Sequence, residues 1–559
     1  MNPLAVYGIV LMLFAVVFVN YSYGQEYDVI IVGAGAAGLG AANQLKELGI
    51  DNVIILEAQD RWGGRVQTDR PWGDDVALDM GAAWISGTDG NPIAELANEY
   101  KAETKETDYE NSVLYYSDGT ASDVDTDTVF RDFEDFYNKY IEKKTVDEPL
   151  KNIVDAYIED LKQKDPKPTE AELRYLNFTI NVYIENEWAG SAETLSALHF
   201  GKVGYKLGEI ETDVTFTHGY DQITNGLANK FGEDKILLNQ LVTKIKSDDD
   251  GVTVYTDNNI FNAKYVIVTV PLGILQKELI DFEPDLPAKK MQAINNLKLG
   301  VLDKAYFLFP EVFWDKYAHV INYVPKENGQ WAYFLNLYPS TEQKILVALN
   351  PLPYATKLET MSDDEIKDEG LKVLNIMYPG KVPDADKVKI HVTRWGQNEY
   401  TGGGSYSYIP YGGTLSDYDV YAQPFGRVFF AGEATTKFFP GLVNGALVTG
   451  IREANRVWAI ENDYPSVCSQ KTGLPFNNAV ASCDNKSKWG HYPEYIICND
   501  LANPPLEIAV LKHTDTKNPI CVTKATKQTL LQRDLLWVPK GSFGKYYRGE
   551  VEESIWNPK

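Results

Sequence analysis

Between residues 27 and 57 the apolar residues form two continuous runs, with a stretch at helical spacing between them. Tyr27–Val32 and Val53–Leu56 are continuous apolar runs rich in β-branched residues, which are typical of buried parallel strands. Between them, residues 36–48 carry apolar side chains at helical spacing, and Gly49 follows as a stop signal. The pattern therefore predicts a strand–helix–strand unit.

Later apolar runs predict further elements. We expect a helix over Asp363–Met377 and mainly helical structure over residues 94–210. Aromatic residues at helical spacing in that second stretch are expected to belong to the core: Phe130, Phe133, Phe136, Tyr137 and Tyr140. Further strands are expected at Ile236–Val242, Gly251–Tyr255, Tyr265–Val270, Tyr333–Tyr338 and Ile345–Leu349.

Three glycines follow the first strand as G-x-G-x-x-G. Gly33 permits a tight turn, Gly35 lets a pyrophosphate approach the backbone, and Gly38 lets the helix pack closely on the strand. Ala36 begins this helix, whose N-terminus stabilises phosphate charge. Glu57 ends the second strand about twenty residues later, where it can accept hydrogen bonds from an adenosine ribose. The unit predicts a dinucleotide-binding site.

The segment after this acid narrows the cofactor. Arg61-Trp62-Gly63-Gly64-Arg65 resembles a segment of the flavin-dependent amine oxidases, which include polyamine oxidases, monoamine oxidases and related histone demethylases. In that family the arginine of a G-G-R segment lies beside the FAD pyrophosphate, so the resemblance assigns Gly64 and Arg65 to the cofactor. The resemblance extends over roughly residues 25–460.

The same resemblance implies further cofactor contacts, at Ala82, Val242, Trp395 and Glu433. Leu442 and Val443 are expected at a helix N-terminus that could stabilise negative charge on a reduced flavin. Monoamine oxidases tether FAD through a cysteine, but no cysteine of this chain precedes residue 468. The FAD should therefore be bound non-covalently.

One lysine is the expected catalytic residue. The segment Leu299–Pro310 resembles the family segment in which a lysine approaches flavin N5 through a water, and Lys304 matches that lysine. A lysine among apolar strand residues is costly to bury unless it is paired or functional. Lys298 lies nearby in a more polar setting and is expected to be exposed.

Four residues are expected at the substrate. Trp84 and Ser86 lie in the segment that passes the flavin ring, where many polyamine oxidases carry an acid or a histidine in place of Ser86. Tyr406 matches an aromatic wall of the substrate tunnel, and Leu442 replaces the aromatic residue often found with it, which weakens a cation–π grip. Glu187 matches a substrate-binding acid of some polyamine oxidases, although a solvated surface glutamate is the other interpretation.

These features predict an α/β fold: a Rossmann-type FAD-binding domain, an interleaved α+β substrate domain and a C-terminal extension that contains the cysteines. The FAD-binding domain is expected to be discontinuous, over residues 25–93, 211–310 and 395–462. The substrate domain is expected over residues 94–210 and 311–394, and the extension over residues 463–559.

The start of the chain predicts secretion. Leu4–Val19 is an apolar run followed by small residues at Ser22 and Gly24, which suits removal of residues 1–24 as a signal peptide. A retained anchor is the alternative, but the run is short for a membrane span. We therefore expect a secreted, extracellular protein without a stable membrane span after cleavage.

Composition restricts the partners. The formal net charge is −26, from 79 acidic and 53 basic side chains, so no nucleic-acid partner is expected. An acidic surface would attract cationic substrates, but it is also a common way of staying soluble. The 6 histidines lack ligand spacing, so no metal site is expected.

Sequons at Asn177 and Asn485 are compatible with glycosylation. An even number of cysteines suggests two disulfides, with three connectivities open: Cys468, Cys483, Cys498 and Cys521.

The resemblance implies a secreted FAD-dependent amine oxidase. It would oxidise polyamines or related amines with O2 and give an imine or aldehyde and hydrogen peroxide. An L-amino-acid oxidase is one alternative, but the segment Gly81–Gly87 offers no arginine for a substrate carboxylate. The other is a secreted flavoprotein with a binding or structural role and a degraded oxidase site. The sequence leaves the amine and the oligomeric state open.

Overall fold

The computed structural model describes residues 26–88, 91–122, 126–199 and 212–461, together with the backbone of three later strands. Those strands form one antiparallel sheet: β22 (Ala479–Ser482), β23 (Leu506–Val510) and β24 (Pro519–Thr523). The expected signal peptide, the second sequon and the side chains of all four cysteines lie outside what is described. Secretion, the disulfides and glycosylation therefore stay predictions.

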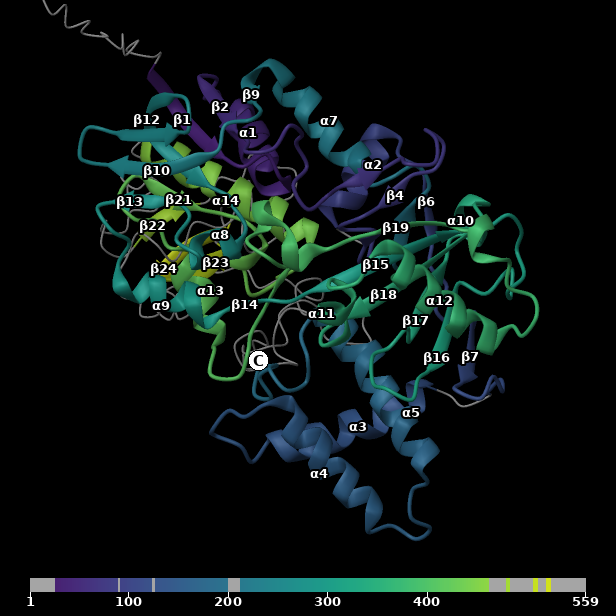
Figure 1. The fold of residues 1–559 in the computed structure, drawn as a ribbon. Helices are drawn as coiled ribbons and strands as arrows, with labels where there is room; N and C mark the ends of the chain where they lie inside the picture. Colours follow the sequence, from purple (N-terminus) through teal and green to yellow (C-terminus); the bar gives the residue numbers. More distant parts are fainter. Residues whose placement is uncertain are drawn as a thin grey trace, which may run out of the picture.

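The first sheet assembles strands from distant parts of the chain (Figure 1). β1 pairs in parallel with β12 on one side and with β2 on the other. Val29–Val32 and all of β2 are buried, which explains their continuous apolar sequences. The strand order is β13-β10-β11-β12-β1-β2-β9, with β21 beside β12. The bounds are Glu26–Val32 (β1), Val53–Leu56 (β2), Ile236–Leu237 (β9), Val242–Ser247 (β10), Val252–Thr256 (β11), Ile260–Val268 (β12), Asp281–Glu283 (β13) and Val428–Phe430 (β21).

Two helices begin near the carboxyl ends of these strands and pack against each other: α1 (Ala36–Glu47) and α14 (Val443–Glu461). Glycine makes this close approach possible, because a Cβ at Gly450 would lie 1.9 Å from the carbonyl oxygen of Ala37. Helices α2 (Pro92–Tyr100) and α7 (Asp221–Phe231) complete this layer. The predicted strand–helix–strand unit is thus confirmed, with α1 one residue shorter than expected.

The second sheet has six strands in the order β19-β15-β18-β17-β16-β7. Helix α12 (Asp363–Met377) and the short α11 (Tyr354–Leu358) contribute side chains to the core on one of its faces. The predicted domain boundary after residue 310 is wrong in one respect, because β15 pairs with β18 and β19 and so belongs to this second sheet. The bounds are Ser112–Tyr116 (β7), Leu302–Leu308 (β15), Val320–Val324 (β16), Tyr333–Asn336 (β17), Ile345–Pro351 (β18) and Lys389–Val392 (β19).

A helical part lies at the bottom of Figure 1, below the second sheet. It contains α3 (Thr126–Ile141), α4 (Leu150–Lys162) and α5 (Glu170–Ile180), and α5 continues through a π-helical turn, Asn181–Glu185, into α6 (Asn186–Trp188). The aromatic residues predicted to be core lie in or against one apolar cluster here, which confirms that prediction.

Short elements connect these layers. The strands are β3 (Thr68–Asp69), β4 (Leu78–Asp79), β5 (Trp84–Ile85), β6 (Thr104–Glu106), β8 (Val214–Phe216), β14 (Lys298–Leu299) and β20 (Ser407–Tyr408). The helices are α8 (Leu272–Gln276), α9 (Ala288–Asn296), α10 (Tyr338–Thr341) and α13 (Leu415–Ala422). Within the part of the chain that the structure describes, no helix is both long and apolar enough to cross a bilayer.

Two predicted strands are interrupted. The expected strand Ile236–Val242 is divided into β9 and β10, because Asn239 has a φ of 56° and turns the chain. The expected strand Tyr333–Tyr338 ends at Asn336, and α10 then begins with Pro339 in its first turn. In both places a local backbone preference interrupts an apolar run.

Candidate functional site

A single large cavity of about 1480 Å³ lies where the carboxyl ends of β1 and β12 approach the second sheet. It exceeds the roughly 300–1,000 Å³ of an ordinary small-molecule pocket, so it has room for a large cofactor and a substrate together. Every site residue predicted from the sequence lines this cavity except Gly38. Residues placed far apart along the chain are therefore brought to one site.

The N-terminus of α1 opens onto the cavity. Gly33 has a φ of +105°, and no side chain in the described residues caps the helix, so its first N–H groups remain available to an anion. Glu57 is buried beside this turn and accepts hydrogen bonds from the backbone N–H groups of Ala34 (2.7 Å) and Gln59 (3.0 Å). Burial raises the pKa of Glu57, and these two hydrogen bonds oppose that effect.

Gly35 and Gly38 are expected to respond differently to alanine. A Cβ at Gly35 would have only the carbonyl oxygen of Gly63, at 3.9 Å, within contact distance, so Gly35→Ala should fold normally but obstruct a pyrophosphate. A Cβ at Gly38 would lie 1.9 Å from the carbonyl oxygen of Gly33, so Gly38→Ala should lower the melting temperature. We expect at least about tenfold weaker cofactor binding for Gly35→Ala with an unchanged apoprotein melting temperature. A reduced melting temperature for Gly35→Ala would contradict this assignment.

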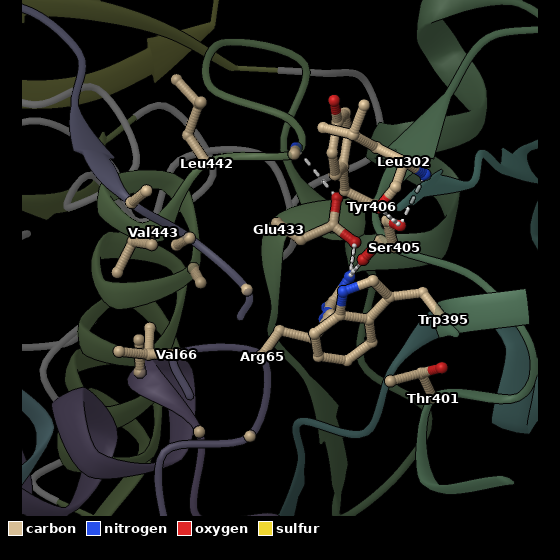
Figure 2. A pocket seen from close by; sticks show the side chains of 18 of the residues that line it. Arg65, Val66, Leu302, Trp395, Thr401, Ser405, Tyr406, Glu433, Leu442 and Val443 are labelled. Carbon is tan, nitrogen blue, oxygen red and sulfur yellow. Dashed lines mark hydrogen bonds and ion pairs between the residues drawn. The ribbon is translucent and has the colours of Figure 1, made fainter. Parts of the chain in front are cut away.

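An ion pair joins the two ends of the cofactor region. Arg65 donates from Nη1 to Glu433 Oε1 (2.7 Å) and to the carbonyl oxygen of Ser405 (2.9 Å), as Figure 2 shows. Glu433 Oε2 accepts from the hydroxyl of Ser407 (2.6 Å) and the N–H of Gly441 (2.9 Å). Both oxygens of Glu433 therefore bind protein donors, and this carboxylate fixes three segments of the cavity wall relative to one another.

The N-terminus of α14 forms another part of the cavity wall. Leu442 and Val443 line the cavity, and α14 begins at Val443. Gly441, with a φ of +76°, lies against the ring of Tyr406, where a Cβ would approach to 3.0 Å. The backbone amides at this helix start can stabilise negative charge in the cavity.

Lys304 reaches the cavity from β15. Its Nζ donates to the carbonyl oxygens of Asp79 (2.7 Å) and Gly81 (2.6 Å), which leaves one of its three protons for the cavity. Burial lowers the pKa of Lys304 to about 8, and the charge of Asp79 opposes this shift. Lys298, by contrast, is exposed, as predicted.

Trp395 and Trp84 flank this lysine. Trp395 donates from Nε1 to the carbonyl oxygen of Met80 (3.2 Å), and its ring packs on Gly81. The ring of Trp84 lies 5.8 Å from Lys304 Nζ. The segment Met80–Trp84 is thus held by hydrogen bonds and ring contacts from two separate parts of the chain, and Ala82 within it also lines the cavity.

The far end of the cavity is acidic. Glu187 is exposed, and its side chain lines the cavity, so its role in substrate binding stays a prediction. Burial, together with the charge of Asp213, raises the pKa of Glu187 to about 7. Asp213 accepts hydrogen bonds from Tyr109 Oη (3.0 Å) and from the N–H of Gly87 (3.1 Å), and burial raises its pKa.

Aromatic residues surround these acids. Tyr109 and Tyr333 line the same end, and Tyr406 donates from its hydroxyl to the carbonyl oxygens of Asn186 (3.0 Å) and Glu187 (3.1 Å). Ser86 also lies on this wall, and its carbonyl oxygen accepts from Asn91 Nδ2. Asp213 and the two tyrosines have no local sequence signal, because they come from loops and from a strand in three different segments.

The residues present suit FAD. The cavity combines glycines without side chains, two helix N-termini, a buried acid after β2 and an arginine, which are the groups that a dinucleotide requires. All four cysteines lie at residue 468 or later, and none belongs to the described lining. Non-covalent binding of the flavin therefore stays a prediction.

Comparison with known proteins gives a consistent assignment. A family model described as "Flavin containing amine oxidoreductase" matches residues 36–458. "Lysine-specific histone demethylase 1 homolog 2" of Arabidopsis thaliana is 33% identical over 454 residues, which cover 78% of this chain but only 59% of that relative. "Polyamine oxidase 1" of Zea mays is 31% identical over 452 residues, which cover 76% of this chain and 89% of that relative.

The fold also matches solved structures. Wild-type putrescine oxidase bound to putrescine superposes with a TM-score of 0.65 at 22% identity, over 78% of this chain and 99% of that one. At this identity the likeness concerns the fold alone. The chain thus spans less than two thirds of the demethylase relative in Arabidopsis and most of the polyamine oxidase.

Proposed function

The chain belongs to the flavin containing amine oxidoreductase family, which uses FAD, and on this premise we propose that it oxidises polyamines or related amines with more than one cationic centre. One observation carries the proposal: Glu187 and Asp213 lie together in the cavity that also contains Lys304 and Trp395. In the described residues no cation is paired with either carboxylate. A distal ammonium of the substrate would supply that cation.

Glu187, which the sequence offered as a substrate-binding acid, and Asp213 would supply the negative charge for the substrate. Ser86 and Leu442 remain poor partners for an ammonium group, since one is neutral and the other is apolar. Glu187 and Asp213 interact electrostatically with each other, and their mutual repulsion is relieved when a cation binds between them. The cation-binding part of the site thus lies at the acidic end of the cavity, where Asp213 accepts from the N–H of Gly87.

The chain's residues bind, orient and desolvate the amine. The redox chemistry would be supplied by bound FAD: transfer of a hydride equivalent from the amine and of the electrons to O2, which gives an imine and hydrogen peroxide. Lys304 holds the Asp79–Gly81 segment and keeps one N–H free for a water at the cavity wall. Lys304 and Trp395 are buried in the cavity wall, where they would align a bound amine.

Two alternatives have less support. An amino-acid oxidase needs a free arginine at the substrate end, but the arginines in the described lining, Arg61 and Arg65, bind Gln67, Gly64, Glu433 and Ser405. A binding protein with a degraded oxidase site would not need Lys304 and Trp395 in the same cavity.

We also propose that the protein is secreted, on the basis of its apolar start and late cysteines.

Removing the acids tests the proposal. Glu187→Gln and Asp213→Asn should each raise KM for spermidine at least about tenfold, which corresponds to about 1.4 kcal/mol of lost binding, with little effect on a monoamine. Glu193→Gln removes a nearby exposed carboxylate and serves as the control. An equal effect on spermidine and monoamine would contradict a distal cation site.

The raised pKa of Glu187 predicts that KM for spermidine depends on pH. Because the pKa of Glu187 is raised to about 7, this carboxyl loses its negative charge as the pH falls through 7. KM for spermidine should therefore rise between pH 8 and pH 6 in the wild type and change less in Glu187→Gln. A pH dependence that is identical in the two proteins would show that Glu187 does not bind the substrate.

A further inference from the structure

The residue before Lys304 lies on the opposite face of β15. Side chains alternate along a strand, so Lys304 faces the cavity while Asp303 points into the core of the second sheet, where it is 2% exposed. Asp303 Oδ1 accepts from the hydroxyl of Thr393 (2.8 Å) and the N–H of Trp395 (2.9 Å). Within the described residues, Oδ2 has no donor.

The group that faces Asp303 is a second carboxyl. Glu359, which follows α11, accepts with Oε1 from the N–H of Gly396, and its charge helps to raise the pKa of Asp303. The two acids therefore accept from two consecutive backbone amides, those of Trp395 and Gly396. These amides begin the 3-10 turn Trp395–Gln397, whose tryptophan lines the cavity.

No described cation neutralises these acids. Lys304 lies on the other face of the strand, and the guanidinium of Arg394 donates to Asp363 and to the carbonyl oxygen of Met361. Asn350, the cross-strand neighbour of Asp303, is neutral and fully buried. Asp303 is buried and Glu359 is half-buried beside it, so ionising both carboxyls carries a large cost.

We propose that Asp303 and Glu359 share one proton and that this acid–carboxylate pair positions Trp395 on the cavity wall. The shared proton gives Asp303 Oδ2 the hydrogen bond that it otherwise lacks. Asp303 acts through Trp395 and is a positioning residue. The inference does not depend on which amine is oxidised.

The electrostatics of the pair agree with this arrangement. Burial raises the pKa of Asp303 to about 8, the N–H of Trp395 opposes the shift, and the charge of Glu359 adds to it. Asp303 would thus be protonated at neutral pH. Above about pH 8 the pair gains a second negative charge, and its hold on the turn should weaken.

Infrared spectroscopy of the purified flavoprotein can detect the shared proton. At pH 7 the wild type should show the carbonyl band of the shared carboxyl in addition to that of Glu187, and the difference spectrum of the wild type against Asp303→Asn should isolate this band, which is lost in the variant. It should also be lost in Glu359→Gln, because the glutamine amide donates to Asp303 and lets it ionise. Asp368→Asn, which changes an exposed acid of α12, should keep the band. A band that persists in Asp303→Asn, or in Glu359→Gln, would overturn the shared proton.

A second readout tests the positioning. Asp303→Asn retains one donor and one acceptor, so it should keep the flavin's visible circular dichroism and reduce within about twofold of the wild-type rate. Asp303→Leu removes both groups and should change the dichroism and slow anaerobic flavin reduction at least about tenfold. If Asp303→Leu matches the wild type in both, the positioning role is wrong. If it fails to fold, Asp303→Asn and Glu359→Gln still decide the question through the infrared band.

Discussion

Replacing Lys304 with methionine is expected to slow anaerobic reduction of the flavin by an amine about 10²–10³-fold while FAD stays bound. Methionine keeps the length of the side chain but removes the charge and all three donors. The carbonyl oxygens of Asp79 and Gly81 then lose their partner, and the cavity loses the one N–H that the lysine keeps free for a water. Stopped-flow absorbance in the flavin bands measures the rate.

A matched lysine provides the control. Lys298 lies on the neighbouring β14 and is exposed, and its side chain does not line the cavity in the described structure. Lys298→Met should therefore reduce at the wild-type rate. If Lys304→Met and Lys298→Met had equal rates, Lys304 would have no part in the chemistry.

Glu433→Gln is expected to produce a protein that is purified largely without FAD. Glu433 is 3% exposed, and each of its oxygens accepts from protein donors. In either orientation a glutamine would turn its NH2 group toward one of those donors and would leave the charge of Arg65 unpaired. Loss of one partner of a buried ion pair costs about 3–5 kcal/mol, which is enough to release the segments that surround the cofactor.

The ratio of flavin absorbance to protein absorbance measures this effect. Asp419→Asn removes the acid of a surface ion pair with Lys437, whose side chains are 46% and 33% exposed, and it should keep its flavin. A yellow Glu433→Gln protein with wild-type flavin content would show that the ion pair with Arg65 does not hold the site together.

Local patterns predict the cofactor half of the site well. The strand–helix–strand unit, its glycines and Glu57 lie within one short stretch, so spacing alone places them together. Lys304 was recognisable because a charged residue stands among apolar strand residues, and the structure buries it as expected. The segment resemblance also placed Trp395 and Val443 on the same cavity.

The substrate half depends on tertiary contacts that the sequence does not show. Asp213 and Tyr109 lie on different loops, and their hydrogen bond forms only when β6 and β8 pair. Glu187 was ambiguous because a glutamate at a helix end is commonly solvated, and its position follows from the π-helical turn before it. Asp303 likewise has no local signal for its partner, Glu359.

Anaerobic titration of the flavoprotein tests the central claim most directly. The full chain would be expressed in a secretory host, and its visible spectrum recorded as spermidine or a simple monoamine is added without oxygen. We expect a bound oxidised flavin that spermidine bleaches at lower concentration than the monoamine, with hydrogen peroxide released when air is readmitted. A bound flavin that no amine bleaches would contradict it.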